Sequence, residues 1–355
     1  MKKLLFCAYD LNIGGIETAL LNLLNNMDYT KYEITLILES KSGVLYDKIN
    51  KNVIVKEYKV STSKNIFIRK IKNFTKRVLW ILKNYHKYDF SCCYATYSMP
   101  CNVLGYYGSK NNCMFIHSNY IYIYPNEKDL RGFFDIRRIN KFRKVVFVAK
   151  EAKDDLTKYY PKLRETSVVI SNLVNSKEIL KLSKEKIEAK KGKNTLFVFV
   201  GRLEEASKKL TRLINVVKKL DKVDFWIIGG GDDYDLYHNM IDGYSNIKMF
   251  GPKTNPYPYM LQADYLVMSS DYEGFPLVYY EAAVLGKKII TTIDVSDDYL
   301  SMKQIAHIVS KNEDEMLNQI KSILKEKNDK TIKIDFNEIN KKKVEKLEER
   351  IVEVI

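Results

Sequence analysis

The chain alternates short apolar segments with helical patterns along almost all of its 355 residues. Thirteen segments have the length and β-branched content of buried strands, and helical segments separate most of them. Strands that alternate with helices pair in parallel and are covered by helices on both faces. The expected strands are residues 3–9, 32–39, 53–58, 89–95, 112–117, 144–149, 167–171, 195–201, 223–229, 246–251, 264–270, 287–292 and 305–310. The sequence therefore predicts an α/β fold.

Thirteen strands are too many for one open sheet of this kind, so two doubly wound domains are predicted. The boundary is expected in the lysine-rich, strand-free stretch 175–194, which gives domains 1–175 and 176–335. A charged helix at about 336–355 has one apolar face and can pack back on the first domain. Open parallel sheets bind ligands beyond the carboxyl ends of their strands, so we expect a site in a cleft between the domains.

Composition limits the class of protein. Hydrophobic residues make up 46% of the chain, which is enough for a sizeable core. The five cysteines are odd in number and lack metal-site spacing, which indicates buried free thiols and no metal centre. The first apolar run stops at Asp10 without a signal-peptide pattern, and no stretch has the roughly 18 apolar residues of a membrane span. A cytoplasmic protein is expected.

Two loops of the first half follow strands. Gly14 and Gly15 precede a helical pattern, where glycine lets a ligand approach the backbone and free helix amides favour an anion. The alternative is a tight turn that merely needs glycine, and the G-x-G-x-x-G pattern of dinucleotide sites is absent. His117 ends an apolar strand, where it either faces the site or serves as a satisfied structural histidine.

Cations follow the first expected strand of the second half. Arg202 stands directly after the strand, and Lys208 is expected at the start of the next helix. Cations near a helix N-terminus oppose the helix dipole, which makes sense if a phosphate lies between them. Lys209 and Arg212, further along, are interpreted as solvated surface charges.

The stretch DYEGFPLVYYEA places two carboxylates around a helix start. Glu281 has only apolar neighbours three and four positions away, although glutamate is rarely buried without a partner. Gly274 opens the backbone, and Pro276 suits the first turn of a helix whose amides would face an anion. Glu273 cannot help to bind phosphate directly, so it is expected to accept hydroxyl groups beside one, such as those of a sugar.

These residues resemble a known family. EGFPLVYYEA has the E-x7-E pattern, Glu273 to Glu281, of the retaining glycosyltransferases of family 4, which have the GT-B fold of two Rossmann-like domains facing a central cleft. The resemblance covers about residues 1–300 and is stronger in the second half. Other segments that resemble the family, in the same order, are GGIE, FIHSNY, GRLEEASKKLTRLI, IKMFG, NPYPYMLQADYLVMSS and KKIITT.

The resemblance implies transfer of a sugar from a nucleotide sugar, expected to be a UDP-sugar, with retention of configuration and without a metal or cofactor. It implies that Glu281 binds the ribose and Glu273 the transferred sugar. Arg202 and Lys208 would neutralise the diphosphate, and His117 would contact the donor sugar near the reacting carbon. The remaining donor-binding residues that it implies are Gly14, Gly15, Phe250, Gly251, Gly274, Phe275, Pro276 and Leu277.

The sequence departs from the family pattern at one loop, which is one residue longer after Arg202 and has Lys209 where a glycine usually follows the lysine. The DYD at 233–235 superficially matches the metal motif of the other glycosyltransferase fold and is interpreted as a solvated loop. A non-catalytic accessory subunit and a sugar-nucleotide epimerase of the same fold are the alternative functions.

The net charge of +15 is concentrated in the first half, where residues 1–175 hold 29 Lys and Arg against 15 Asp and Glu. Residues 64–88 carry eight Lys or Arg, no acid and one apolar side, and residues 131–144 add basic charge beside aromatic residues that we expect to be exposed. Basic amphipathic segments bind anionic membrane surfaces. The alternative is a core-packing helix with a lysine-rich outer face, and nucleic acid is disfavoured because no binding motif accompanies the charge.

We therefore expect peripheral attachment to the inner face of the cell membrane. There the protein would meet a glycan or lipid-linked acceptor, in the synthesis of a bacterial surface polysaccharide or glycolipid.

Overall fold

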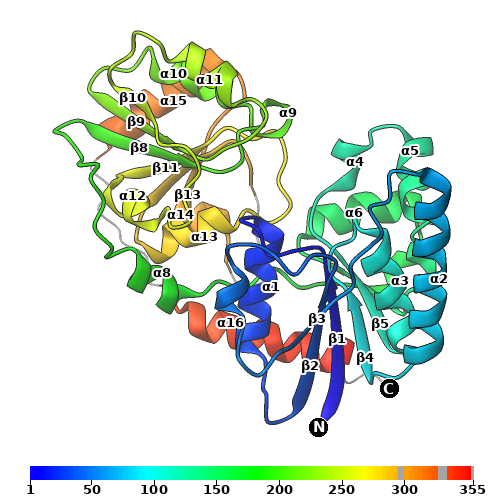
Figure 1. The fold of residues 1–355 in the computed structure, drawn as a ribbon. Helices are drawn as coiled ribbons and strands as arrows, with labels where there is room; N and C mark the ends of the chain where they lie inside the picture. The colour runs from blue at the N-terminus through cyan, green and yellow to red at the C-terminus, as the bar shows by residue number, and fades with distance from the viewer. Residues whose placement is uncertain (295–299, 327–333, 353–355) are drawn as a thin grey trace. The chain divides into compact units, whose positions relative to one another are not determined.

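The computed structural model of the chain describes residues 1–294, 300–326 and 334–352. The chain divides into two compact units, one of Met1–Leu173 with Asn340–Ile355 and one of Val174–Ile339. Each unit is built on one parallel sheet, and all thirteen predicted strands are present (Figure 1).

The first unit holds a seven-stranded sheet of order β3-β2-β1-β4-β5-β6-β7, in which every neighbouring pair is parallel. Its strands are β1 (Lys2–Ala8), β2 (Tyr32–Leu38), β3 (Ile54–Glu57), β4 (Phe90–Cys93), β5 (Asn112–Ile116), β6 (Lys144–Phe147) and β7 (Ser167–Val169). The strand order reverses between β1 and β4. Loops that follow these two strands therefore diverge, which is where open α/β sheets bind ligands.

Helices cover both faces of this sheet (Figure 1). They are α1 (Gly15–Asn26), η1 (Tyr46–Lys48), α2 (Ile66–Asn84), α3 (Met99–Gly108), α4 (Tyr120–Ile123), α5 (Glu127–Asp135), η2 (Ile139–Lys141), α6 (Lys150–Tyr159) and α7 (Leu163–Thr166). Helix α3 packs on β1, β4 and β5, because Gly105 brings its backbone so close that a Cβ would lie 2.5 Å from the Cys93 amide nitrogen. Helix α2 packs on the outer side of α3.

The aromatic residues of the basic segment 131–144 are not exposed, contrary to the prediction. Phe134 and Phe142 are 0% and 3% exposed and belong to the core cluster of this unit. Arg137 is also buried, and its guanidinium donates to the backbone carbonyls of Thr96, Tyr97 and Phe133 at 2.8–3.0 Å. This segment thus closes a core with its aromatic rings and uses one arginine to satisfy buried carbonyls.

The second unit repeats the design with a six-stranded parallel sheet of order β10-β9-β8-β11-β12-β13. The order reverses between β8 and β11. The strands are β8 (Thr195–Val200), β9 (Val223–Ile228), β10 (Ile247–Met249), β11 (Tyr265–Met268), β12 (Lys288–Thr291) and β13 (Ala306–Ile308). The helices are α8 (Ser176–Leu182), α9 (Glu205–Lys208), α10 (Leu210–Val217), α11 (Tyr234–Met240), α12 (Tyr257–Gln262), α13 (Leu277–Val284), α14 (Met302–Ile305) and α15 (Glu313–Lys325).

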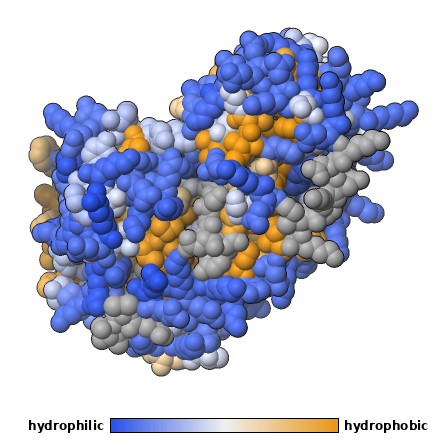
Figure 2. Space-filling view, turned by 180° about the vertical axis from the view of Figure 1, so that it is seen from behind, coloured by the Kyte–Doolittle hydropathy of each residue, from blue (hydrophilic) through white to orange (hydrophobic). Residues whose placement is uncertain are grey.

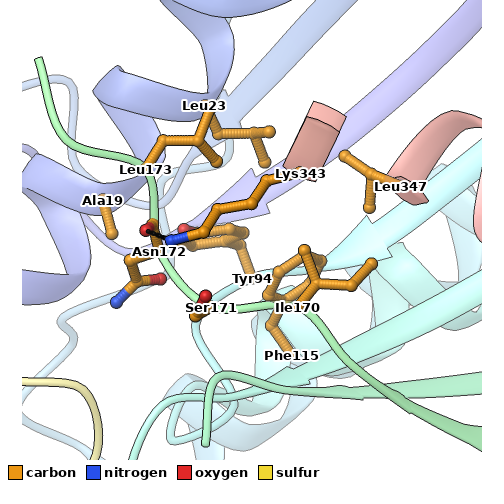
Figure 3. Close-up of a pocket in the computed structure, with 10 residues that line it drawn as sticks. All are labelled: Ala19, Leu23, Tyr94, Phe115, Ile170, Ser171, Asn172, Leu173, Lys343 and Leu347. Atoms are coloured by element: carbon orange, nitrogen blue, oxygen red, sulfur yellow. Dashed lines mark hydrogen bonds between the residues drawn. The ribbon is translucent and has the colours of Figure 1, made fainter. Parts of the chain in front are cut away.

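The C-terminal helix α16 (Phe336–Leu347) and the π-helical turn η3 (Glu348–Val352) return the chain to the first unit. Within that unit Lys343 is buried, and its ammonium group donates to the Asn172 carbonyl at 3.1 Å across a small pocket (Figure 3). The pocket is lined by Ala19, Leu23, Tyr94, Phe115, Ile170, Ser171, Asn172, Leu173, Lys343 and Leu347. The last helix therefore completes the core of the unit that begins the chain.

Candidate functional site

Two loops of the second unit meet at its topological switch point, and a lysine from one binds a glutamate from the other. Lys208, in the segment that follows β8, donates to the Glu273 carboxylate, in the loop that follows β11, at 2.6 Å. Ser270 also donates to Glu273, at 2.6 Å. The two side chains of the ion pair are 18% and 9% exposed. Charged groups this enclosed lose much of their hydration, which costs free energy. The short, well-aligned contact between Lys208 and Glu273 offsets that cost.

Lys208 is the last residue of the short helix α9, whereas the sequence predicted it at a helix start. Lys209 follows in the left-handed region with φ +50° and separates α9 from α10. This left-handed residue is where the family pattern has glycine, which adopts that conformation at no steric cost. Lys208 thus ends α9 with its ammonium group on Glu273.

Arg212 is not a solvated surface charge, contrary to the prediction. Its guanidinium donates to the Asp271 carboxylate at 3.0 Å and to the Ser269 carbonyl at 3.1 Å, and its side chain is only 16% exposed. The Ser269 hydroxyl in turn donates to the Lys208 carbonyl at 3.1 Å and the Lys209 carbonyl at 2.8 Å. These contacts fasten the segment after β8 to the segment after β11 and so fix the position of the ion pair.

The loop that carries Arg202 is shaped by the triple glycine after β9. A Cβ on Gly229 would lie 1.9 Å from the Gly201 carbonyl oxygen, and one on Gly231 would lie 2.3 Å from the Leu203 carbonyl oxygen. The Leu203 amide donates to the Gly230 carbonyl at 2.9 Å. Only glycine allows this close backbone approach. Arg202 itself is exposed, so its guanidinium remains accessible.

Helix α13 begins directly after the EGFP loop. Pro276 is its N-cap residue and has no backbone N–H to satisfy. Phe275 is buried and stacks on Tyr280 with ring centroids 4.3 Å apart, which anchors the loop. Gly274 is partly exposed, and Leu277 is the buried first residue of the helix. The first amides of α13 lack intrahelical acceptors, as at any helix start, and suit an anion.

Glu281, on the second turn of α13, has a polar partner that the sequence did not reveal. The Tyr257 hydroxyl, from the first residue of α12, donates to its carboxylate at 3.1 Å. Burial raises the pKa of Glu281 to about 7, and the Tyr257 hydrogen bond partly offsets that rise. The carboxylate is thus held in an environment that penalises its charge unless further donors arrive.

The predicted base-binding loop follows β10. The Phe250 amide donates to the Ile227 carbonyl at 2.9 Å, and the Gly251 carbonyl accepts from the Gly229 amide at 3.0 Å. These two groups are therefore engaged in the strand ladder. The Phe250 carbonyl and the Gly251 amide belong to one peptide unit and point in opposite directions, so only one of them can face a base. The Phe250 ring packs edge-on against Trp226.

In the first unit, the predicted glycines lie after β1, beside the switch point of that sheet. Gly14 is the extended N-cap residue of α1, and a Cβ there would meet the Glu17 carboxylate at 2.2 Å. Gly15 is the first residue of α1, and a Cβ there would have no neighbour within 4 Å. A side chain at Gly14 would have to displace the Glu17 carboxylate, which a flexible side chain allows, and the space around Gly15 is open.

His117 follows β5 and is only 8% exposed. Its Nε2 lies 3.0 Å from the Tyr94 carbonyl oxygen, and a carbonyl can only accept, so Nε2 carries the proton. Burial lowers the pKa of His117 to about 4, and the ring is neutral at pH 7. Its Nδ1 is then a buried acceptor, and among the described residues nothing donates to it. One ring nitrogen of His117 thus has a structural hydrogen bond, and the other is left without a donor among the described residues. This arrangement does not decide between a structural histidine and one that faces the site.

The described residues contain no group of three or more His, Cys, Asp or Glu side chains that could hold a metal ion. In the DYD motif, Asp233 accepts from the Glu205 amide at 2.7 Å and so supports the start of α9. This residue therefore has a structural role and is not the fully solvated loop residue that the sequence predicted.

Comparisons with known proteins agree with this architecture. Residues 181–342 match the family model described as "Glycosyl transferases group 1". The uncharacterized glycosyltransferase MJ1178 of Methanocaldococcus jannaschii is 26% identical over 309 residues, which cover 82% of this chain and 79% of that relative.

Solved structures show the same fold. Anabaena HepE, in complex with UDP-glucose, aligns with a TM-score of 0.73 at 15% identity and covers 98% of this chain and 100% of its own. A mutant of S. aureus TarM, in complex with UDP, fondaparinux and α-GlcNAc-glycerol, aligns with a TM-score of 0.68 at 15% identity, with coverage of 99% and 97%. The chain therefore has the GT-B fold, as predicted. All but the last three residues of the region that matches the group 1 model lie in its second unit.

Proposed function

We propose that the protein is a glycosyltransferase that takes its sugar from a nucleotide-sugar donor bound by the second unit. The observation that carries this proposal is the Lys208–Glu273 pair at the switch point between β8 and β11, in the region that matches the group 1 model. A cation, a carboxylate and free helix amides at one sheet edge suit a ligand that combines phosphate with hydroxyl groups. A nucleotide sugar is such a ligand.

The proposed donor is a UDP-sugar. Support comes from the HepE structures, which were determined with UDP-glucose, with UDP and glucose, and with UDP. In the present chain the base would lie by the loop at Phe250 and Gly251, and the ribose hydroxyls would donate to Glu281. These hydrogen bonds would supply the donors that the enclosed Glu281 carboxylate needs.

Arg202, Lys208 and the first amides of α13, near Leu277, are proposed to bind the diphosphate. Preorganised cations and amides stabilise the charge that develops on a leaving group without reorganising at the moment of reaction. The Lys208 ammonium group donates to Glu273. A diphosphate gives the ammonium group a second anionic partner, and Glu273 can then turn an oxygen to the hydroxyls of the transferred sugar.

The first unit is proposed to contribute hydrogen-bonding groups rather than charge. The open backbone at Gly15 suits approach by an anionic group, and the unprotonated Nδ1 of His117 suits a substrate hydroxyl. The only ring proton of His117 is on Nε2, where it makes a hydrogen bond to the Tyr94 backbone carbonyl. His117 would therefore act on a substrate as a hydrogen-bond acceptor through Nδ1 rather than as a general acid.

The remaining parts of the reaction are also proposals. Transfer would proceed with retention of configuration through an oxocarbenium-like transition state, in which Arg202 and Lys208 stabilise the departing nucleoside diphosphate. Because these cations supply the positive charge, no metal would be required. The acceptor would be a glycan or a lipid-linked molecule in bacterial surface polysaccharide or glycolipid synthesis, reached at the inner face of the membrane.

Calorimetric titration of the whole chain with UDP, ADP and GDP tests the donor site. We expect UDP to bind, and Lys208→Met to weaken binding at least tenfold, which is about 1.4 kcal/mol. Lys321→Met, at an exposed lysine of α15, is the matched control and should bind as the wild type does. Binding of none of the three nucleotides, or equal binding by both variants, would overturn the proposed site.

A further inference from the structure

Helix α2 leaves most of its large apolar side chains in solvent and packs on the protein through a mixed polar and apolar side. It is 19 residues long, and none of its residues is buried. Seven of its large apolar side chains are at least 44% exposed, namely Ile66, Phe67, Ile68, Ile71, Phe74, Leu79 and Leu82. Apolar residues on a surface helix normally face the core, so this orientation is the reverse of the core-packing helix considered above.

The exposed apolar side chains gather on one side of the helix. At about 100° per residue, Phe67, Ile71, Phe74, Val78 and Leu82 fall within an arc of roughly 80°. All five are exposed. The side chains that lose most solvent lie outside this arc and face the rest of the unit, next to α3: these are Asn73, Lys76, Arg77, Trp80, Ile81 and Asn84.

Contacts on the packed side hold the helix in this orientation. Asn73 accepts from the Ser61 amide at 2.6 Å, and the Lys76 ammonium group lies over the Tyr58 ring, 4.9 Å from its centroid. The Asn65 side chain caps the helix start by accepting from the amides of Phe67 and Ile68. A rotation that buried the apolar arc would break these contacts, so the exposure is built into the fold.

Basic residues border the exposed apolar side of the helix. Lys70 lies beyond one border, next to Phe74, and Lys72 and Lys83 lie beyond the other, next to Leu79. All three lysines are exposed, and residues 64–88 contain eight Lys or Arg and no acid. In Figure 2 hydrophobic side chains reach the outer edge of the first unit on the side where α2 lies. A contiguous exposed apolar face of this kind marks an interaction surface.

We propose that α2 docks the protein on an anionic lipid bilayer, with the apolar arc inserted among the lipids and the flanking Lys and Arg at the headgroups. Side chains such as Phe, Leu and Ile over a Lys- and Arg-rich border are what interfacial helices use. At 19 residues the helix is about 28 Å long and lies along the membrane plane. No helix of the described residues is long and apolar enough to cross a bilayer.

Charge selects the bilayer over a second copy of the chain. Two α2 helices that met face to face would bring six cations against six, with no acid in either helix to offset the repulsion. An anionic membrane surface instead supplies opposite charge together with an apolar interior. The segment 131–144 takes no part in the inserted surface, because its aromatic rings belong to the core.

Flotation of the whole chain with lipid vesicles tests the proposal. Vesicles of phosphatidylcholine with about 30% phosphatidylglycerol should carry the protein, whereas pure phosphatidylcholine should not. The triple variant Phe67→Ser, Phe74→Ser, Leu82→Ser should reduce bound protein about tenfold or more. The matched control Leu180→Ser, Leu236→Ser, Leu261→Ser removes three exposed leucines of the second unit and should float like the wild type.

The outcomes separate the possible occupants. A Phe74→Trp variant should show a blue-shifted emission with anionic vesicles, as an inserted side chain would. No flotation, equal flotation with neutral vesicles, or full flotation of the α2 triple variant overturns the proposal. Sedimentation without lipid that shows a dimer abolished by the triple variant assigns the face to a second copy, and also overturns it.

The proposal does not depend on the reaction. UDP titration of the α2 triple variant in solution should match the wild type, so loss of membrane binding and loss of donor binding are distinguishable.

Discussion

Replacing Glu281 by Gln should separate two effects of this carboxylate: its charge lowers the stability of the folded protein, and it is proposed to bind the ribose of the donor. Burial raises the pKa of Glu281 from 4.5 to about 7 in the folded protein. The folded state then holds a proton that the unfolded state has released, so this group's contribution to stability is complete below pH 4.5 and is lost as the pH rises through 7. Glutamine carries no charge to bury, and it can still accept the hydrogen bond from Tyr257.

The magnitude follows from the same shift. At 1.36 kcal/mol per pKa unit, the full shift corresponds to about 3 kcal/mol, of which about 2 kcal/mol is lost between pH 5 and pH 8. Glu281 keeps some solvent access, so this figure is an upper bound. We therefore expect Glu281→Gln to gain up to about 2 kcal/mol of unfolding free energy at pH 8, relative to its effect at pH 5.

Urea denaturation at the two pH values measures the stability, and UDP titration measures the function. The variant should be the more stable protein at pH 8 and the weaker binder of UDP, because the amide replaces one carboxylate acceptor with a donor. If Glu281→Gln changed the unfolding free energy equally at pH 5 and pH 8, the claim that the buried charge of Glu281 destabilises the fold would be refuted. Undiminished UDP affinity would refute the role in ribose binding.

Three further predictions concern donor binding by Glu281, the backbone at Gly229 and the protonation of His117. UDP-glucose affinity should fall about tenfold per unit as the pH drops below about 7, because Glu281 must be ionised to accept hydroxyls, and Glu281→Gln should abolish this dependence in calorimetric titrations. Gly229→Ala should lower the unfolding free energy by about 2 kcal/mol or more, because its Cβ would lie 1.9 Å from the Gly201 carbonyl oxygen; an unchanged urea midpoint would contradict the close approach. Nitrogen NMR of His117 should show a neutral ring with the proton on Nε2 from pH 5.5 to 8, and titration near 6.5 would contradict its burial against Tyr94.

The strands were predictable because buried parallel strands are short and almost wholly apolar. Every one of the thirteen expected segments overlaps an observed strand, with ends that differ by a few residues. The positions of the site loops followed from the fold, because parallel strands place their carboxyl ends at one edge of a sheet. Lys208 and Glu273 were each identified from the sequence because each lies in a loop that follows a predicted strand.

Pairings between distant residues were not predictable from local patterns. Lys208 and Glu273 are 65 positions apart, and Arg212 and Asp271 are 59 apart, so their ion pairs depend on the strand order. For this reason Arg212 looked like surface charge. Tyr257 carries no local signal at all, and only the packing of α12 beside α13 could reveal it as the partner of Glu281.

The two basic segments show a further limit of pattern reading. An amphipathic sequence shows that a helix has two faces but does not say which one meets the protein. In α2 the apolar face points outward, whereas in residues 131–144 the aromatic rings point inward. The tertiary contacts that decide this, such as Asn73 with Ser61, come from residues outside each pattern.

The measurement that tests the central claim most directly is UDP release from a panel of UDP-sugars by the wild type, Glu273→Gln and the matched control Glu315→Gln, at an exposed glutamate of α15. If the second unit holds the donor as proposed, the wild type and Glu315→Gln should release UDP from at least one member of the panel. Glu273→Gln should be slower by about 100-fold or more, because the sugar loses its carboxylate partner and Lys208 loses its anchor. Equal rates for Glu273→Gln and the wild type, or no release from any UDP-sugar, would contradict the account.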